Sequence, residues 1–195
     1  LVKFEEALTY DDVLLIPQYS TIESRKEIDI GNDLDLTAYL ELPIISSPMD
    51  TVTGAEMALT MFEQGGLGII HRYNSIEQQT QEVQKVKKAT GGWATPTYPI
   101  GAAEGMTGDY RERASELVSY GAKVICVDVA HGHHALMKNA IKTLKKDWGS
   151  DIHIMAGNVA TLEGFNDLAD WGADSVRCNI GGGSICSTRI QTGHG

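Results

Sequence analysis

Short apolar runs alternate along the chain with segments whose apolar residues stand three and four positions apart. Such runs are typical of strands, and such spacing is typical of amphipathic helices. The runs predict strands over residues 43–47, 67–71, 98–103, 123–129, 153–157 and 175–180. The periodic segments predict helices over residues 54–64, 76–88, 110–120, 134–148 and 162–171. This alternation predicts an α/β fold with a parallel sheet and right-handed crossovers.

Polar residues at the ends of the predicted strands decide between two α/β architectures. Nearly every strand ends in small or reactive groups, among them His71, Asp128 and Asn158. A (β/α)8 TIM barrel opens all of these ends onto one face, whereas an open sheet gathers only the loops around its switch point. The barrel is therefore favoured. Because it needs eight units and about six are found, residues 1–195 are interpreted as one partial catalytic barrel domain.

A glycine-rich loop follows the last predicted strand, and we expect the chemistry there. Residues 179–189 read Asn-Ile-Gly-Gly-Gly-Ser-Ile-Cys-Ser-Thr-Arg. Adjacent glycines permit positive φ and close approach to a ligand, and amide N–H groups can gather around an anion. A cysteine held there, Cys186, can become a reactive thiolate when its pKa is lowered. The alternative is a turn with a small apolar cysteine.

Composition and charge exclude several classes of protein. The 195 residues are 42% hydrophobic and carry a formal net charge of -10, with scattered basic residues apart from the cluster at 85–88. Nucleic-acid binders concentrate positive charge, so none is expected here. No apolar run spans a bilayer and no signal peptide begins the chain, which predicts a soluble, cytoplasmic protein. Three unpaired cysteines, Cys126, Cys178 and Cys186, indicate neither a disulfide framework nor a structural zinc site.

Five sequence strings together resemble the IMP dehydrogenase and GMP reductase family over essentially the whole chain. They lie in the family's order and stand at residues 8–17 (LTYDDVLLIP), 46–53 (SSPMDTVT), 65–71 (GGLGIIH), 156–161 (AGNVAT) and 183–186 (GSIC). The resemblance implies a barrel enzyme that acts at C2 of a purine nucleotide, with Cys186 as the attacking nucleophile. It implies that Thr188 lies near the leaving group or the attacking water; a helix-capping hydroxyl is the alternative.

Two reactions are compatible with the resemblance. In the dehydrogenase, IMP loses a hydride to NAD and the covalent intermediate is hydrolysed to XMP. In the reductase, GMP loses ammonia and accepts a hydride from NADPH. Val129 and residues 20–29 are similar to the reductase, whereas residues 46–49, 75–79 and 131–133 are similar to bacterial dehydrogenases. We favour the dehydrogenase, with GMP reductase as the alternative.

The resemblance also assigns binding roles. It implies that Ser47, Met49, Asn158 and Ser184 bind the substrate, with Met49 near the base and Ser184 near the phosphate. For Asn158, turn chemistry is the alternative. The resemblance places Asp128 at the nicotinamide ribose; burying an unpaired aspartate is costly, which supports a functional role. A potassium ion is implied at the backbone carbonyls of Gly181, Gly183 and Cys186, and a homotetramer is the usual assembly.

Two family features are missing from the sequence. The regulatory CBS pair that dehydrogenases usually insert is absent near residues 89–97, and the last two strands would follow Gly195. A non-catalytic nucleotide-binding fragment therefore remains a rival. A metal-dependent hydrolase is a second rival, since Asp128, His131, His133 and His134 offer carboxylate and imidazole ligands. Cys126 and Cys178 are predicted to be core residues.

Overall fold

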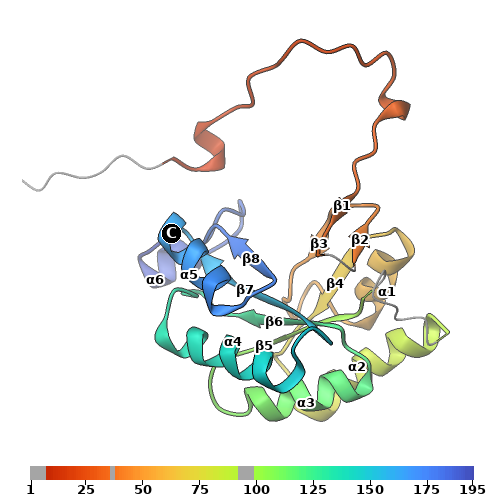
Figure 1. The fold of residues 1–195 in the computed structure, drawn as a ribbon, viewed down its shortest axis with the longest axis vertical. Helices are drawn as coiled ribbons and strands as arrows, with labels where there is room; N and C mark the ends of the chain where they lie inside the picture. The colour runs from red at the N-terminus through yellow and green to blue at the C-terminus, as the bar shows by residue number, and fades with distance from the viewer. Residues whose placement is uncertain (1–7, 36–37, 92–98) are drawn as a thin grey trace, which may run out of the picture.

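The computed structural model describes residues 8–35, 38–91 and 99–195 of the chain. Within this part, six strands form one parallel sheet in sequential order, and Figure 1 shows the sheet curling with its helices on the outside. The strands are β3 (Ile45–Ser46), β4 (Leu67–Ile70), β5 (Gly101–Glu104), β6 (Val124–Asp128), β7 (His153–Val159) and β8 (Ser175–Cys178). This curled sheet is a half-barrel, so the predicted incomplete TIM barrel is confirmed.

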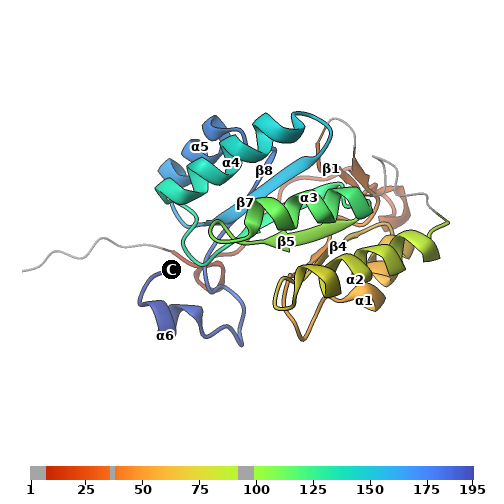
Figure 2. The same ribbon diagram turned by 90° about the horizontal axis from the view of Figure 1, so that it is seen from below.

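Five helices connect the strands and cover the outer face of the sheet (Figures 1 and 2). They are α1 (Ala55–Glu63), α2 (Ile76–Ala89), α3 (Tyr110–Tyr120), α4 (Ala135–Trp148) and α5 (Leu162–Trp171). Local sequence sets their ends: Ser75 closes a capping box with Gln78, and Gly121 and Gly172 end α3 and α5 with positive φ. A sixth helix, α6 (Thr188–Thr192), follows the glycine-rich loop.

Two apolar layers hold the half-barrel together, one on each face of the sheet. The outer layer joins Ile125, Val127 and Ile154 to helix residues such as Leu117 and Leu144, all fully buried. The inner layer joins alternate strand residues, namely Leu67, Ile69, Ala103, Val124, Cys126 and Met155. This alternation explains the near-continuous apolar strands, because a parallel sheet covered on both faces needs apolar residues at every position. Cys126 is confirmed as a core residue.

A short antiparallel hairpin lies against the inner layer. Its strands, β1 (Asn32–Asp33) and β2 (Tyr39–Leu40), pair Asn32 with Leu40 and Asp33 with Tyr39. Leu40 is buried among the inner-layer residues, with Leu34 packed beside it. The hairpin therefore covers the inner face of the sheet, and the pattern of apolar positions did not predict it.

The predicted elements agree with the structure except at several ends. Helices α3 and α5 have the predicted bounds, whereas β8 ends at Cys178 rather than at residue 180 and β7 continues to Val159. The predicted strand over 98–103 begins at residue 98, which lies outside the described residues. The predicted absence of an inserted domain near residues 89–97 also falls mostly on undescribed residues, since the description stops at Gly91 and resumes at Pro99.

An N-terminal arm, residues 8–31, runs away from the hairpin and arches beside the half-barrel (Figure 1). It contains the 3-10 turns Tyr10–Asp12 and Arg25–Glu27, and large apolar side chains such as Leu14, Leu15 and Tyr19 are more than 90% exposed. Across residues 8–35, 38–91 and 99–195, the structure has no helix long and apolar enough to cross a membrane.

Candidate functional site

The glycine-rich loop leaves β8 with a backbone that few residues adopt. Asn179 has a φ of 83° and Gly181 a φ of 69°, both in the left-handed region. Arg189 closes the base of the loop: its Nε donates to the carbonyl of Ile180 at 2.9 Å, and its Nη2 reaches Asn179 Oδ1 at 3.4 Å. The loop between these points presents Cys186 to solvent.

Cys186 stands beside Thr188, as its Sγ lies 3.2 Å from Thr188 Oγ1. The Thr188 hydroxyl and backbone N–H lower the pKa of the Cys186 thiol, and the charge of Arg189 lowers it further. Burial instead raises the pKa of Cys126 to about 12. Thr188 is the first residue of α6, whose N-cap is Ser187, so Thr188 does not occupy the capping position, and its predicted catalytic role stays a prediction. The two thiols therefore differ in exposure and in pKa, and only Cys186 combines an exposed side chain with a lowered pKa.

Asp128 ends β6 and forms an ion pair with Arg177 of β8. The Arg177 guanidinium also lies 3.8 Å from the Cys126 sulfur, on the inner face of the sheet. Arg72, which follows β4, donates to the Asp128 backbone carbonyl at 3.4 Å. The aspartate is therefore paired rather than alone, and its contacts with these two arginines were not predicted from the sequence. Strand alternation could have revealed Arg177, because it shares the inner face of β8 with Ser175.

Asn158 connects two of the loops at the carboxyl ends of the strands. Its side-chain amide donates to the carbonyl of Asn179 at 2.9 Å, which fixes the start of the glycine-rich loop. Its own carbonyl accepts the N–H of Gly132 at 2.8 Å, which fixes the loop after β6. The residue therefore holds the neighbouring loops in place, and its predicted contact with substrate stays a prediction.

The remaining predicted substrate residues lie in two separate places. Ser47 borders a cavity of about 170 Å³ inside the half-barrel, together with Arg177. Met49 follows it and is 47% exposed. Ser184 is exposed on the glycine-rich loop with Cys186. The structure therefore brings Ser47 close to the Asp128–Arg177 pair, while the thiol and its neighbours stand outside that cavity.

The three predicted potassium ligands lie on the glycine-rich loop. The carbonyl of Gly183 accepts the N–H of Cys186 at 2.9 Å, so it already closes a turn. Oxygen ligands from backbone carbonyls suit a hard cation. In this loop conformation the Gly183 carbonyl accepts one backbone hydrogen bond, and potassium binding at the three carbonyls stays a prediction.

Cys178 differs from its predicted role, and the loop histidines do not support the rival hypothesis of a metal-dependent hydrolase. Cys178 was predicted to be a core residue, and this is wrong: the strand ends there and leaves its side chain exposed. Across the described ranges, no group of three or more His, Cys, Asp or Glu side chains could hold a metal ion. The loop histidines have structural contacts instead, since His133 lies 2.9 Å from Asp167 and His134 accepts the N–H of Leu136.

The chain matches known proteins along nearly its whole length. A family model described as IMP dehydrogenase / GMP reductase domain matches residues 7–195. The chain is 37% identical to inosine-5'-monophosphate dehydrogenase of Cryptosporidium parvum, over 97% of the chain and 55% of that protein. It is 34% identical to the enzyme of the same name from Borreliella burgdorferi, over 98% of the chain and 57% of that protein. It is 28% identical to GMP reductase of Leishmania major, over 97% of the chain and 64% of that protein. The chain therefore spans 55 to 64% of the length of these relatives.

Proposed function

Because the chain belongs to the IMP dehydrogenase / GMP reductase family, we propose that it oxidises IMP to XMP with NAD through a covalent bond to Cys186. The family's named members are oxidoreductases, two of them inosine-5'-monophosphate dehydrogenases that are more than 30% identical to this chain. The observation that carries the proposal is the exposed Cys186 thiol, whose pKa the Thr188 hydroxyl lowers.

The thiolate of Cys186 begins the proposed reaction by attacking C2 of the purine and forming a carbon–sulfur bond. Covalent catalysis of this kind divides a difficult displacement into two easier steps. A bound nicotinamide cofactor supplies the acceptor for the hydride that leaves C2. Water then attacks C2, the carbon–sulfur bond breaks, and XMP and the free thiol result. Thr188 Oγ1, 3.2 Å from the sulfur, is placed to hydrogen-bond the thiolate and the attacking water.

The residues at the end of β6 fit a nicotinamide nucleotide. Arg177 holds Asp128 Oδ1, and the carboxylate is half-buried at the carboxyl end of its strand. The carboxylate oxygens of an aspartate accept hydrogen bonds from ribose hydroxyls. In this proposal Asp128 therefore binds the nicotinamide ribose. Ser47 and Met49 line the nucleotide site, Asn158 lies beside the substrate and Ser184 contacts its phosphate.

A potassium ion would bind on the same glycine-rich loop. Its ligands would be the carbonyls of Gly181, Gly183 and Cys186, of which the Gly183 carbonyl also accepts the N–H of Cys186. No catalytic step is assigned to the ion. The homotetramer and the cytoplasmic location stay predictions that rest on the family resemblance.

GMP reduction with NADPH is the second candidate function. Val129 follows Asp128 as in the reductases, and one of the similar proteins is the GMP reductase of Leishmania major. The same thiolate would attack C2 of GMP, ammonia would leave, and C2 would accept a hydride before the carbon–sulfur bond breaks. Both candidates therefore need the same nucleophile and differ in the second step.

A turnover assay separates the two candidates. The chain is given IMP with NAD, and separately GMP with NADPH, and the nicotinamide absorbance band is followed. We expect IMP oxidation that falls by roughly 10⁴-fold or more in Cys186→Ala, since removal of a catalytic nucleophile has effects of that size. Cys178→Ala removes another exposed thiol and is the matched control, expected to stay within about twofold of the parent. Reduction of GMP without oxidation of IMP would assign the reductase instead, and turnover that survives Cys186→Ala would refute both candidates.

A further inference from the structure

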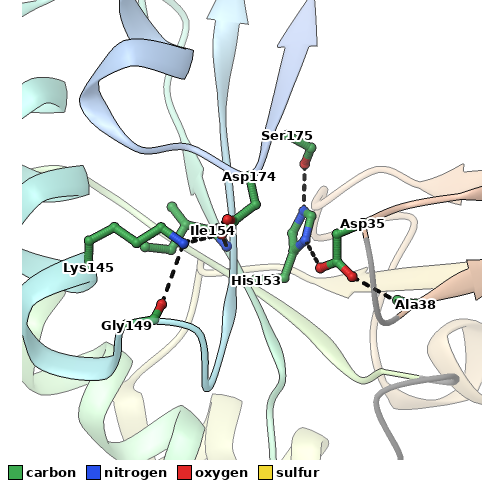
Figure 3. A network of polar contacts seen from close by, with 8 residues as sticks. All are labelled: Asp35, Ala38, Lys145, Gly149, His153, Ile154, Asp174 and Ser175. Carbon is green, nitrogen blue, oxygen red and sulfur yellow. Dashed lines mark hydrogen bonds and ion pairs between the residues drawn. The ribbon is translucent and has the colours of Figure 1, made fainter.

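Three side chains from separate segments form a hydrogen-bonded line at the amino ends of the strands (Figure 3). His153, the first residue of β7, has its Nδ1 2.5 Å from Asp35 Oδ2 and its Nε2 2.7 Å from Ser175 Oγ. Ser175 is the first residue of β8, and Asp35 belongs to the hairpin segment. These residues lie at the opposite ends of the strands from the loop that carries Cys186.

The three residues are arranged as a nucleophile (Ser175), a base (His153) and a carboxylate that positions the base (Asp35). The His153 side chain is 4% exposed, and the N–H of Ala38 donates to Asp35 Oδ1 at 3.0 Å, which fixes the carboxylate. When Nδ1 carries its proton toward Asp35, Nε2 is left to accept the proton of the Ser175 hydroxyl. Serine–histidine–aspartate centres are recognised by this geometry and by these roles, whatever the fold or the sequence order.

Space for a small substrate adjoins the serine. Ser175 borders the cavity of about 170 Å³ inside the half-barrel, and Arg177 borders it as well. Both side chains belong to the inner face of β8, two residues apart, and the guanidinium is held by Asp128. The cavity has the volume of about five or six water molecules in the liquid, which suits an acyl group of a few carbons. A larger cavity of about 630 Å³ borders Asp35 and His153.

A structural clamp is the alternative interpretation of the same contacts. Asp35 and His153 tie the hairpin to the sheet, and the neighbouring pair Lys145–Asp174 is clearly of this kind, since Asp174 also accepts the N–H of Ile154 at 2.7 Å. That pair, however, lacks a nucleophile. Ser175 is only half-buried and faces a cavity, whereas a purely structural serine needs no open side.

We propose that Ser175 and His153, positioned by Asp35, form a second catalytic centre that hydrolyses esters with short acyl groups. Ser175 Oγ attacks the carbonyl carbon while its proton passes to His153 Nε2. The bond from that carbon to the alcohol oxygen breaks, and the alcohol leaves with the proton from Nε2. Water then attacks the acyl-serine with His153 as base, the carboxylic acid departs, and the serine hydroxyl is restored. No oxidant or reductant is needed, and the centre is independent of Cys186.

Ester hydrolysis in a background without the competing thiols tests this proposal. The parent for the assay carries Cys186→Ala and Cys178→Ala, which remove both exposed thiols, and the substrate is p-nitrophenyl acetate. We expect hydrolysis above the buffer rate that is lost, by roughly 100-fold or more, when Ser175→Ala is added. Ser150→Ala, which removes an exposed serine bordering the larger cavity, is the matched control and should match the parent. For the positioning residue, Asp35→Asn should lower kcat by roughly tenfold or more while KM stays unchanged.

Covalent labelling decides between catalysis and a structural clamp. A fluorophosphonate probe should label the parent protein at one site, and peptide mass spectrometry should place the label on Ser175. Circular dichroism and the urea midpoint confirm that each variant is folded, and Ser175→Cys, labelled by iodoacetamide, retains a nucleophile at the same place. Absence of a fluorophosphonate adduct on Ser175 in the folded parent, or hydrolysis that persists in Ser175→Ala, overturns the proposal. A lower urea midpoint in Ser175→Ala without labelling of the parent shows a clamp only, and overturns it equally.

Discussion

The two ends of the half-barrel hold their nucleophiles in opposite ways. At the carboxyl ends of the strands, Cys186 is exposed on a loop, and its reactivity depends on Thr188 and Arg189 within the same short segment. At the amino ends, Ser175 is held against a buried histidine that a separate hairpin positions. A thiol needs only a lowered pKa to react, whereas a serine needs a base and a positioning group assembled from distant segments. A site of the first kind can therefore stand on a single loop, and a site of the second kind cannot.

The largest expected effect is the difference in reactivity between two thiols. Cys186 has a lowered pKa and is exposed, whereas burial raises the pKa of Cys126 to about 12. At neutral pH we expect iodoacetamide to modify Cys186 at least ~10³-fold faster than Cys126, because the thiolate is the reacting species. Peptide mass spectrometry over time measures both rates, and Cys186→Ser should remove the fast phase. Equal rates in the folded protein would show that the carboxyl-end loop does not activate its thiol.

Among the substitutions considered for stability, the largest loss is expected at the amino ends of the strands, at His153. His153→Ala removes both hydrogen bonds of a buried ring and leaves the hydroxyl of Ser175 and a carboxylate oxygen of Asp35 without that partner. We expect the free energy of unfolding to fall by about 2–4 kcal/mol. His131→Ala removes an exposed histidine and should change it by about 0.5 kcal/mol or less. Urea titration of both variants tests this, and a similar small loss for both would mean that the line of contacts contributes little.

Glu104 gives the carboxyl end a buried acid that is sensitive to pH. Its side chain is fully buried, and among the described residues neither carboxyl oxygen has a hydrogen-bond partner. Burial raises its pKa well above the ordinary value of 4.5, although the charge of Arg113 opposes this. A raised acid pKa favours the folded state at low pH, and this contribution is full below pH 4.5 and is lost as the pH rises through the folded-state pKa.

Glu104→Gln removes that ionisation and should therefore remove its contribution to the pH dependence of stability. At about pH 8 the variant should be more stable than the parent by on the order of 1 kcal/mol or more, and the difference should shrink as the pH falls toward about 4.5. Urea midpoints across this range measure the effect, with Glu116→Gln, an exposed acid on α3, as the control. If the difference in stability between the variant and the parent instead grew as the pH fell, the folded state would favour the charged carboxylate, which would contradict the raised pKa.

The smallest effect is expected at Thr188. Thr188→Ala removes the hydroxyl that lowers the pKa of Cys186, so alkylation at neutral pH should slow by roughly threefold to tenfold. The free energy of unfolding should stay within about 0.5 kcal/mol, because Thr188 begins a short helix that buries none of its residues. Thr188→Ser keeps the hydroxyl and should restore the rate. A loss of stability without a change in rate would assign Thr188 a structural role.

Most of the half-barrel could be predicted from sequence because its elements are long and periodic. Helices α3 and α5 match their predicted bounds, and strands such as β6 are continuous apolar runs in the sequence. The hairpin could not be predicted in the same way. Its strands have two residues each, which is too short for an alternation of apolar and polar positions to be recognised. Its place is decided by Leu40 packing against residues distant in sequence.

The sequence predicted which residue types carry the chemistry of the candidate site, but not which side chains contact one another there. The glycine-rich loop and the family strings identified Cys186 and Thr188, which the structure places 3.2 Å apart. Arg177 escaped notice because its role depends on a neighbouring strand, where it pairs with Asp128. Cys178 was misassigned for a related reason: the strand was predicted to continue to residue 180, but it ends at Cys178 and leaves that side chain exposed. The pattern of apolar and polar residues predicts which segments form helices and strands. It does not predict which residues of neighbouring segments a side chain contacts.

The central claim is that Cys186 forms a covalent bond to C2 of a purine nucleotide, and a direct measurement uses inosine monophosphate with chlorine at C2. Attack by the thiolate displaces chloride and leaves the same carbon–sulfur intermediate that water would hydrolyse to XMP, so each sample is quenched in acid immediately after mixing to trap it. Intact-protein and peptide mass spectrometry should show one nucleotide, less the elements of hydrogen chloride, on Cys186 and none in Cys186→Ala. If the nucleotide is never found on Cys186 while iodoacetamide still modifies that residue in the same folded sample, the claim is contradicted.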